Sequence, residues 1–186
     1  MLCATVSQAQ QWHFGPKLDL QYSGLKGNGV KSSVSPGWQA GAFAELQFNK
    51  NWGLQPELVF SWSRYKKAGD FLTYYNNYGR SNASEKITLA YVRVPVLLKY
   101  HYNNTFSFLA GPQYGYRVFE DENLLKNSVD AFKKYEVSGI GGVQVNISNV
   151  GFYARYKLGL SNINDIDDRY KWTSKHIQVG VAVSIK

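Results

Sequence analysis

The sequence predicts an all-β protein, an eight-stranded antiparallel up-and-down transmembrane β-barrel. Eight stretches alternate polar and apolar residues with a period of two, which indicates strands with one apolar and one polar face. The connections between these stretches are alternately short and long, as in barrels that cross an outer membrane. No run approaches the roughly 20 apolar residues that a membrane-spanning helix needs. The expected location is therefore the cell outer membrane.

Alternation is clearest in the first strand, expected over residues 12–22, where Leu18 and Leu20 flank Asp19 and every even position is apolar. The apolar face should meet lipid and the polar face should line the barrel interior. The other seven strands are expected at residues 37–48, 52–65, 87–102, 105–119, 135–147, 150–161 and 174–185. Short turns at residues 49–51, 103–104 and 148–149 should face the periplasm, and the long connections should be extracellular.

The first residues resemble the end of a cleavable signal peptide. An apolar run, residues 1–6, precedes Ser7-Gln8-Ala9, a small-x-small cleavage pattern. We therefore expect residues 1–9 to be the remnant of a signal peptide and residues 10–186 to form the barrel domain. Cys3 is the only cysteine, so the mature chain should have no disulfide framework.

Aromatic residues and net charge give a first indication of partners. The chain holds 14 Tyr, 10 Phe and 5 Trp, a load typical of the aromatic girdles of membrane barrels. Its net charge is 21 − 13 = +8, but the cations are scattered singly rather than clustered. This pattern argues against nucleic-acid binding. It is compatible with outer-membrane lipids and with the phosphates of lipopolysaccharide as partners.

Ten ionisable residues fall on the polar face of the predicted strands. An eight-stranded barrel has an interior that side chains just fill, so we expect a packed network of ion pairs and no open pore. A narrow ion path is the functional alternative. The ten residues are Lys17, Arg93, Lys99, Arg117, Arg155, Lys157, Asp19, Glu45, Glu57 and Glu136.

Four of the five prolines lie inside predicted strands, where each removes a donor from the hydrogen-bond ladder. All four are nearer the short turns than the long connections. We expect bulges or locally broken pairing at that level. The prolines are Pro16, Pro56, Pro95 and Pro112.

Four segments, taken in order, resemble the PorT-like outer-membrane β-barrel family of Bacteroidetes. They are LQPEL at residues 54–58, VPVLLKY at 94–100, GPQYGY at 111–116 and RYKLGLSNI at 155–163. The resemblance implies an eight-stranded outer-membrane barrel without assigned chemistry, some members being linked to secretion and gliding machinery. The chain departs from the family at Arg93, where an acidic residue is frequent, and it lacks a terminal aromatic residue.

One candidate catalytic set is a Ser/His/acid group near the extracellular end. His176 should project inward close to Ser161, with Asp165 or Asp167 in the connecting loop, an arrangement that would suit lipid A deacylation. Isolated His and Ser residues at a barrel mouth are more often simply solvated. We therefore predict no enzyme activity and no catalytic residues.

Two loop segments offer binding chemistry. Residues 164–168 carry oxygen ligands suited to calcium, but they lack the glycine and the distal glutamate of a calcium loop, so we predict no metal and no cofactor. Aromatic side chains in the second long loop could stack on sugars or on a partner protein, or could extend the girdle. They are Phe71, Tyr74, Tyr75 and Tyr78.

We therefore expect a structural or interaction role, exercised through the extracellular loops and an envelope protein partner. An accessory role in secretion or gliding is the first alternative, followed by a narrow channel or a lipid-modifying enzyme. A soluble lipocalin-like barrel, which buries its apolar face around a ligand, is the last alternative.

Overall fold

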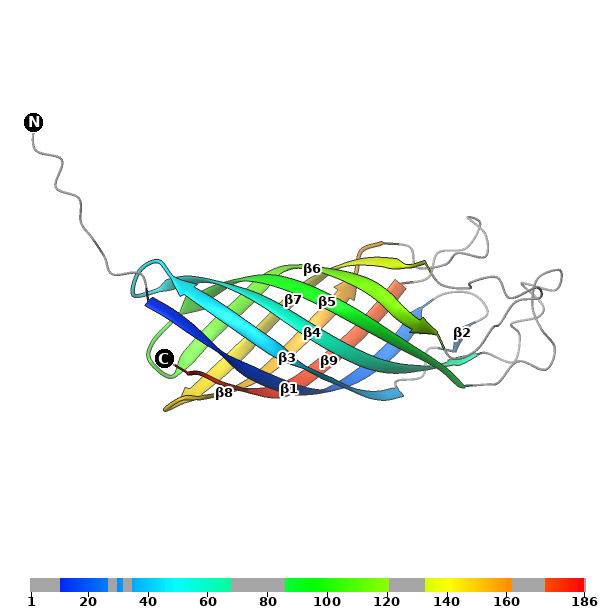
Figure 1. Cartoon of the computed structure of the whole chain (residues 1–186), viewed down its shortest axis with the longest axis horizontal. Helices are drawn as coiled ribbons and strands as arrows, with labels where there is room; N and C mark the ends of the chain where they lie inside the picture. Colours follow the sequence, from blue (N-terminus) through cyan, green and yellow to red (C-terminus); the bar gives the residue numbers. More distant parts are fainter. Residues whose placement is uncertain are drawn as a thin grey trace, which may run out of the picture.

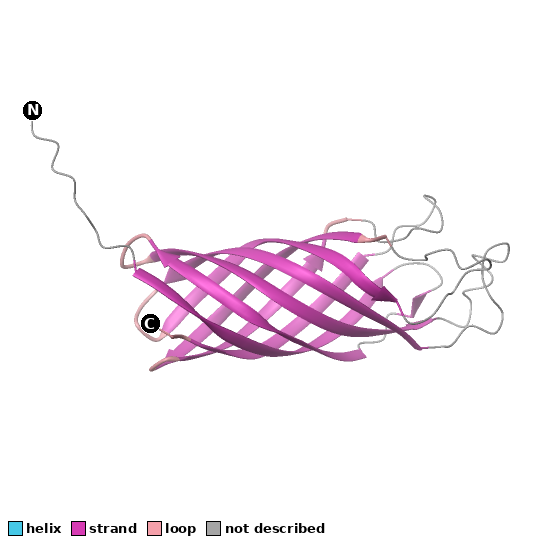
Figure 2. Cartoon of the chain, viewed as in Figure 1, coloured by secondary structure: helices cyan, strands magenta, loops and turns pink. Residues whose placement is uncertain are grey.

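The chain folds into one closed antiparallel barrel, as a computed structural model shows (Figure 1). The structure describes residues 11–26, 30–31, 35–67, 86–120, 133–161 and 173–185. All regular structure in this part of the chain is β-strand (Figure 2). Within the described residues, no helix is long and apolar enough to cross a membrane.

Eight long strands form the wall, in the ring order β4-β3-β1-β9-β8-β7-β6-β5, and β5 pairs with β4 to close it. A two-residue strand, β2, adds to β4 beyond the end of β3 and was not predicted. The eight predicted strands are confirmed, with ends that move by only a few residues. The bounds are β1 Gln11–Lys26, β2 Val30–Lys31, β3 Ser35–Gln47, β4 Trp52–Lys67, β5 Lys86–His101, β6 Phe106–Glu120, β7 Tyr135–Ile147, β8 Val150–Gly159 and β9 Thr173–Val183.

The apolar face of the sheet lies outside and the polar face inside. Leu18 is 54% exposed, whereas the adjacent Asp19 is 1% exposed. All ten ionisable residues expected in the interior are buried. The alternative of a soluble barrel that buries its apolar face is therefore wrong.

The strand prolines interrupt pairing without changing register. Beside Pro16, pairing of β1 with β9 stops at Lys17 and returns only as an isolated bridge at Phe14, because proline has no N–H to donate. The partner positions remain in step on both sides of this gap. Equivalent gaps lie beside Pro56 between β3 and β4, beside Pro95 between β4 and β5, and beside Pro112 between β5 and β6. The predicted broken pairing is confirmed, but none of these gaps is a bulge.

A register shift occurs at the other end of the barrel, between Ala90 and Tyr91 of β5. The extra residue on β6 is Val118, so Val118 and Phe119 are both exposed although they are consecutive. Phe119 then lies opposite Ala90, and its ring stacks on Trp62 with centroids 5.9 Å apart. Because the two rings come from the strands on either side of Ala90, they cover this outward position, and Ala90 is only 1% exposed.

Aromatic pairs on the outer surface lie near both ends of the barrel. Trp52 and Tyr100 pack with centroids 4.8 Å apart near the short turns. At the long-loop end, Trp38 packs on Phe60 at 6.0 Å, and Tyr135 contacts a tyrosine pair on β6. Rings with an apolar body and a polar edge favour the two membrane–water interfaces, so these positions mark the membrane boundaries.

Candidate functional site

The middle of the barrel is bridged by one carboxylate that receives two cations. Glu57 on β4 accepts two hydrogen bonds of 2.9 Å from the guanidinium of Arg155 on β8. It also accepts one of 2.7 Å from Lys17 Nζ, which lies 3.6 Å from Asp19. β4 and β8 are four strands apart in either direction around the ring, so this bridge spans the lumen. The Tyr153 ring lies under both cations, 4.2 Å from Arg155 and 4.8 Å from Lys17.

A second charge cluster lies nearer the long-loop end and is centred on Glu136 of β7. Lys157 Nζ donates to Glu136 at 2.9 Å, and Arg93 Nη2 lies 3.6 Å away. Ser174 on β9 also donates a hydrogen bond to this carboxylate. Arg93 is held further by a hydrogen bond to Ser61, so residues of five strands meet in this cluster. The predicted ion pairing of the lumen is confirmed in both clusters.

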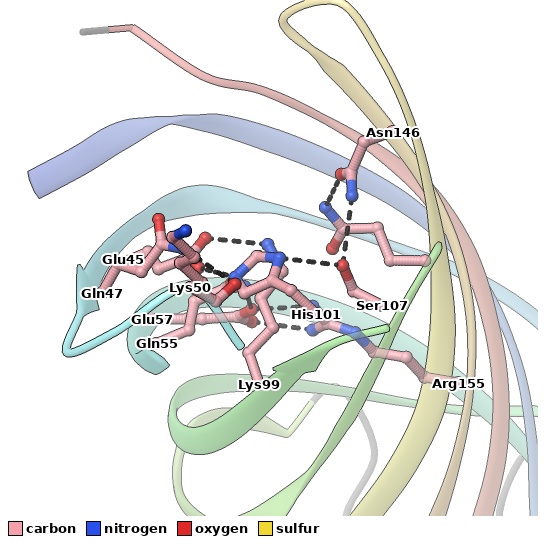
Figure 3. A network of polar contacts seen from close by, with 11 residues as sticks. Glu45, Gln47, Lys50, Gln55, Glu57, Lys99, His101, Ser107, Asn146 and Arg155 are labelled. Carbon is pink, nitrogen blue, oxygen red and sulfur yellow. Dashed lines mark hydrogen bonds and ion pairs between the residues drawn. The ribbon is translucent and has the colours of Figure 1, made fainter. Parts of the chain in front are cut away.

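A third cluster, centred on Glu45 of β3, occupies the short-turn end (Figure 3). Its two carboxylate oxygens pair with His101 Nε2 at 2.6 Å and with Lys99 Nζ at 2.8 Å, both from β5. His101 Nδ1 lies 3.1 Å from Ser107 Oγ. Gln55 joins this cluster to the middle one, because it accepts from Lys99 at 3.3 Å and donates to Glu57 at 2.7 Å.

Apolar side chains fill the space that the charged clusters leave. Leu97, Leu109 and Ile140 from three neighbouring strands form one buried group. Phe43, Tyr153 and Ala182 form another. The lumen is therefore an interior of ion pairs and apolar contacts built from side chains of all eight long strands.

A polar cavity of about 570 Å³, which we call the vestibule, opens at the short-turn end. Its floor includes Phe43 and the Glu45 cluster, and its rim is formed by the short turns. Seven asparagine or glutamine residues contribute to its lining. Sequence analysis missed this cavity, although the asparagine-rich turns and the inward position of His101 were visible signals.

The proposed Ser/His/acid set is not assembled. His176 pairs in register with Lys157, and its Nδ1 lies 2.8 Å from Ser23 Oγ of β1. Ser161 Oγ instead accepts a hydrogen bond of 3.0 Å from the backbone N–H of Val137. The expectation that His176 and Ser161 are close is wrong, because His176 lies opposite Lys157, four residues and about 13 Å along the chain from Ser161. Asp165 and Asp167 lie outside the described residues.

The other loop candidates also lie outside the described part of the chain. This applies to residues 164–168, considered for calcium, and to the aromatic residues between 71 and 78. Residues 1–9, the expected signal peptide, are outside it as well. Among the described residues, no group of three or more His, Cys, Asp or Glu could hold a metal ion.

A protein family defined by an outer membrane protein beta-barrel domain matches residues 8–165. The chain belongs to this family. Its location is the outer membrane, and in barrels of this kind the short turns face the periplasm. No curated protein matches the sequence.

Solved outer-membrane barrels share the fold at low sequence identity. Ail of Yersinia pestis, solved with the heparin analogue sucrose octasulfate, is 13% identical with a TM-score of 0.55, covering 94% of this chain and 99% of its own. Neisserial surface protein A is 13% identical with a TM-score of 0.56, over 92% and 97%. OprG of Pseudomonas aeruginosa is 11% identical with a TM-score of 0.54, over 94% and 95%. These similarities establish the eight-stranded closed barrel.

Proposed function

We propose that this protein is a closed outer-membrane barrel that acts as an interaction module, and that its extracellular end binds phosphate groups of lipopolysaccharide. The observation that carries the proposal is a row of lysines across three strands. Lys66 of β4 lies opposite Lys31 of β2 on one side and opposite Lys86 of β5 on the other. We call these three residues the lysine row.

Like charges at directly opposed positions of an antiparallel pair are destabilising in general. An anion that binds beside the row removes this cost, as phosphate does when it meets several cationic groups. The short strand β2 supplies one of the three lysines. It pairs with β4 beyond Ser35, the first residue of β3. The strand register therefore places three lysine positions that are distant in the sequence on three adjacent strands.

The height of the lysine row fits a lipopolysaccharide phosphate. Lys66 follows Trp62 by four positions, about 13 Å along the strand. At a strand tilt of about 40°, this is about 10 Å along the membrane normal. Since Trp62 and Phe119 pack together in the girdle at the outer interface, the row lies at the level of the polar headgroups and the first core sugars.

Two further observations support this proposal. The lumen is crossed by the Glu57–Arg155 bridge, which favours an interaction role over a channel. Ail, which has the same fold, was solved with a polysulfated sugar, so a barrel of this type presents sites for clustered anions. The narrower kinship with PorT-like barrels of Bacteroidetes belongs to the proposal too, and the four motif segments support it.

The test is binding of lipopolysaccharide by the full chain in nanodiscs, measured at several salt concentrations. Replacing Lys31, Lys66 and Lys86 by Gln should weaken binding about tenfold, equivalent to about 1.4 kcal/mol, and should flatten the salt dependence. A control with Gln at Lys50, Lys133 and Lys134 loses the same charge and should bind as the parent does. Enzymatically dephosphorylated lipopolysaccharide should bind weakly to every variant. Equal loss in the two triple variants would show that only net charge matters and would refute the site.

A further inference from the structure

We propose that the vestibule binds an N-acetylated oligosaccharide that carries at most one carboxylate, the chemistry of the cell-wall glycan that faces this end of the barrel. The site is separate from the lysine row, at the opposite end of the molecule. Its volume of about 570 Å³ falls in the range of small-molecule sites and accommodates a disaccharide.

The charge balance of the vestibule limits the ligand to a nearly neutral one. Both oxygens of Glu45 are engaged, by Lys99 at 2.8 Å and by His101 at 2.6 Å. Both carboxylate oxygens of Glu45 are therefore already occupied by partners inside the site, and Glu45 does not attract a metal ion or a cationic ligand. Among the described residues that line the vestibule, Lys50, exposed at the rim, is the lysine available to meet a single carboxylate on the ligand.

The polar groups of the vestibule match sugar hydroxyl and acetamido groups. Gln144 is 5% exposed, and its Nε2 donates to Asn146 at 2.6 Å, which fixes the amide. Its Oε1 has no hydrogen-bond partner in the structure, so a buried acceptor lines the cavity. A buried acceptor without a donor is unfavourable, and an N–H or O–H of a ligand removes the cost. Gly151 makes this placement possible, because a Cβ there would lie 2.4 Å from Gln144 Nε2.

An aromatic platform completes the site. Tyr102 lines the vestibule and is 66% exposed, so its ring is accessible to a ligand. A tyrosine offers a flat apolar surface at a low entropic cost, together with a hydroxyl for hydrogen bonding. Such a ring packs against the C–H face of a pyranose, while amides bind its edge. A peptide would use the carboxylate contact at Lys50 but would not need the ring.

Histidine NMR of the full chain in nanodiscs tests the proposal directly. The chain has three histidines, and two of them, His13 and His101, line the vestibule, whereas His176 lies in the outer half of the barrel. With ¹⁵N-labelled histidine, titration with chitobiose or with N-acetylglucosaminyl-N-acetylmuramic acid should shift the His13 and His101 signals. The His176 signal should stay in place. Absence of saturable shifts with both sugars at millimolar concentration would overturn the proposal.

Two variants test the assigned contacts. Tyr102→Ala should weaken both sugars about tenfold, and Lys50→Gln should weaken only the carboxylated one. Tyr135→Ala and Lys175→Gln are matched controls at the extracellular end, and both should bind as the parent does. Trialanine serves as a peptide probe. Shifts caused by trialanine but not by the sugars would make the vestibule a peptide site and would also overturn the proposal.

Discussion

Arg155 and Glu57, 98 residues apart in the sequence, form a two-pronged ion pair between strands on opposite sides of the barrel. Each guanidinium nitrogen that donates lies 2.9 Å from its carboxylate oxygen. This planar geometry is the strongest form of a charge-assisted hydrogen bond between side chains. Because Lys17 and Gln55 donate to the same carboxylate, Glu57 organises the centre of the lumen.

We expect Glu57→Gln to lower the free energy of unfolding by about 3 to 5 kcal/mol, because it removes the anion of the buried Arg155 and the nearer of the two carboxylates beside Lys17. Urea unfolding in lipid vesicles, followed by tryptophan fluorescence, measures this change. The double variant Glu57→Gln, Arg155→Gln should lose less than the sum of the two single variants. Additive losses would mean that the two side chains do not stabilise each other.

The bridge also predicts the electrical behaviour of the barrel. The parent protein should show no discrete conductance steps in planar lipid bilayers, because side chains from opposite walls meet in the lumen. Replacing both Glu57 and Arg155 by Ala removes the bridge and should produce measurable ion conductance. Stable steps in the parent protein would contradict the closed lumen and support the narrow channel.

Gly180 of β9 should not tolerate a side chain. A Cβ at this position would lie 2.1 Å from Asp19 Oδ1, 2.6 Å from the backbone oxygen of Leu18 and 2.7 Å from the Tyr153 hydroxyl. We expect Gly180→Ala to cost about 1 to 3 kcal/mol in the same urea assay. Gly141→Ala is the matched control, since no atom lies within 4 Å of the added Cβ, and it should be neutral or slightly stabilising. Equal effects of the two changes would show that packing around Asp19 is not the cause.

Alternation in the sequence was sufficient to predict which residues face lipid and which face the lumen. A period of two places Asp19 inside once Leu18 is outside, and closure of eight strands follows from their number and loop lengths. The choice of ion-pair partners could not be predicted in this way. Glu57 has several cations within reach in a small barrel, and only the register and stagger of the strands select Arg155. The vestibule and β2 depend on turns and strand ends, where alternation gives no signal.

The bulge at Val118 gives the last prediction, because it reverses the alternation of β6. Beyond Val118, Phe119 faces outward and stacks on Trp62 over Ala90. Deleting Val118 would place Phe119 directly after Arg117, which faces the lumen, so strict alternation would keep the phenylalanine outward and opposite Ala90. The deletion would therefore remove the extra residue of the bulge and keep the stacked pair of the girdle.

We therefore expect the Val118 deletion to lower the free energy of unfolding by less than about 1 kcal/mol and to leave the fluorescence of Trp62 unchanged. Val118→Ala keeps the chain length and serves as the control, with a loss below about 1 kcal/mol, because an exposed side chain is shortened. Comparing the two variants separates the effect of the extra residue in β6 from the effect of losing the valine side chain. If the deletion instead lowered the free energy of unfolding by more than about 2 kcal/mol or changed the fluorescence of Trp62, the extra residue itself would be needed to hold the stacked pair at this end of the barrel.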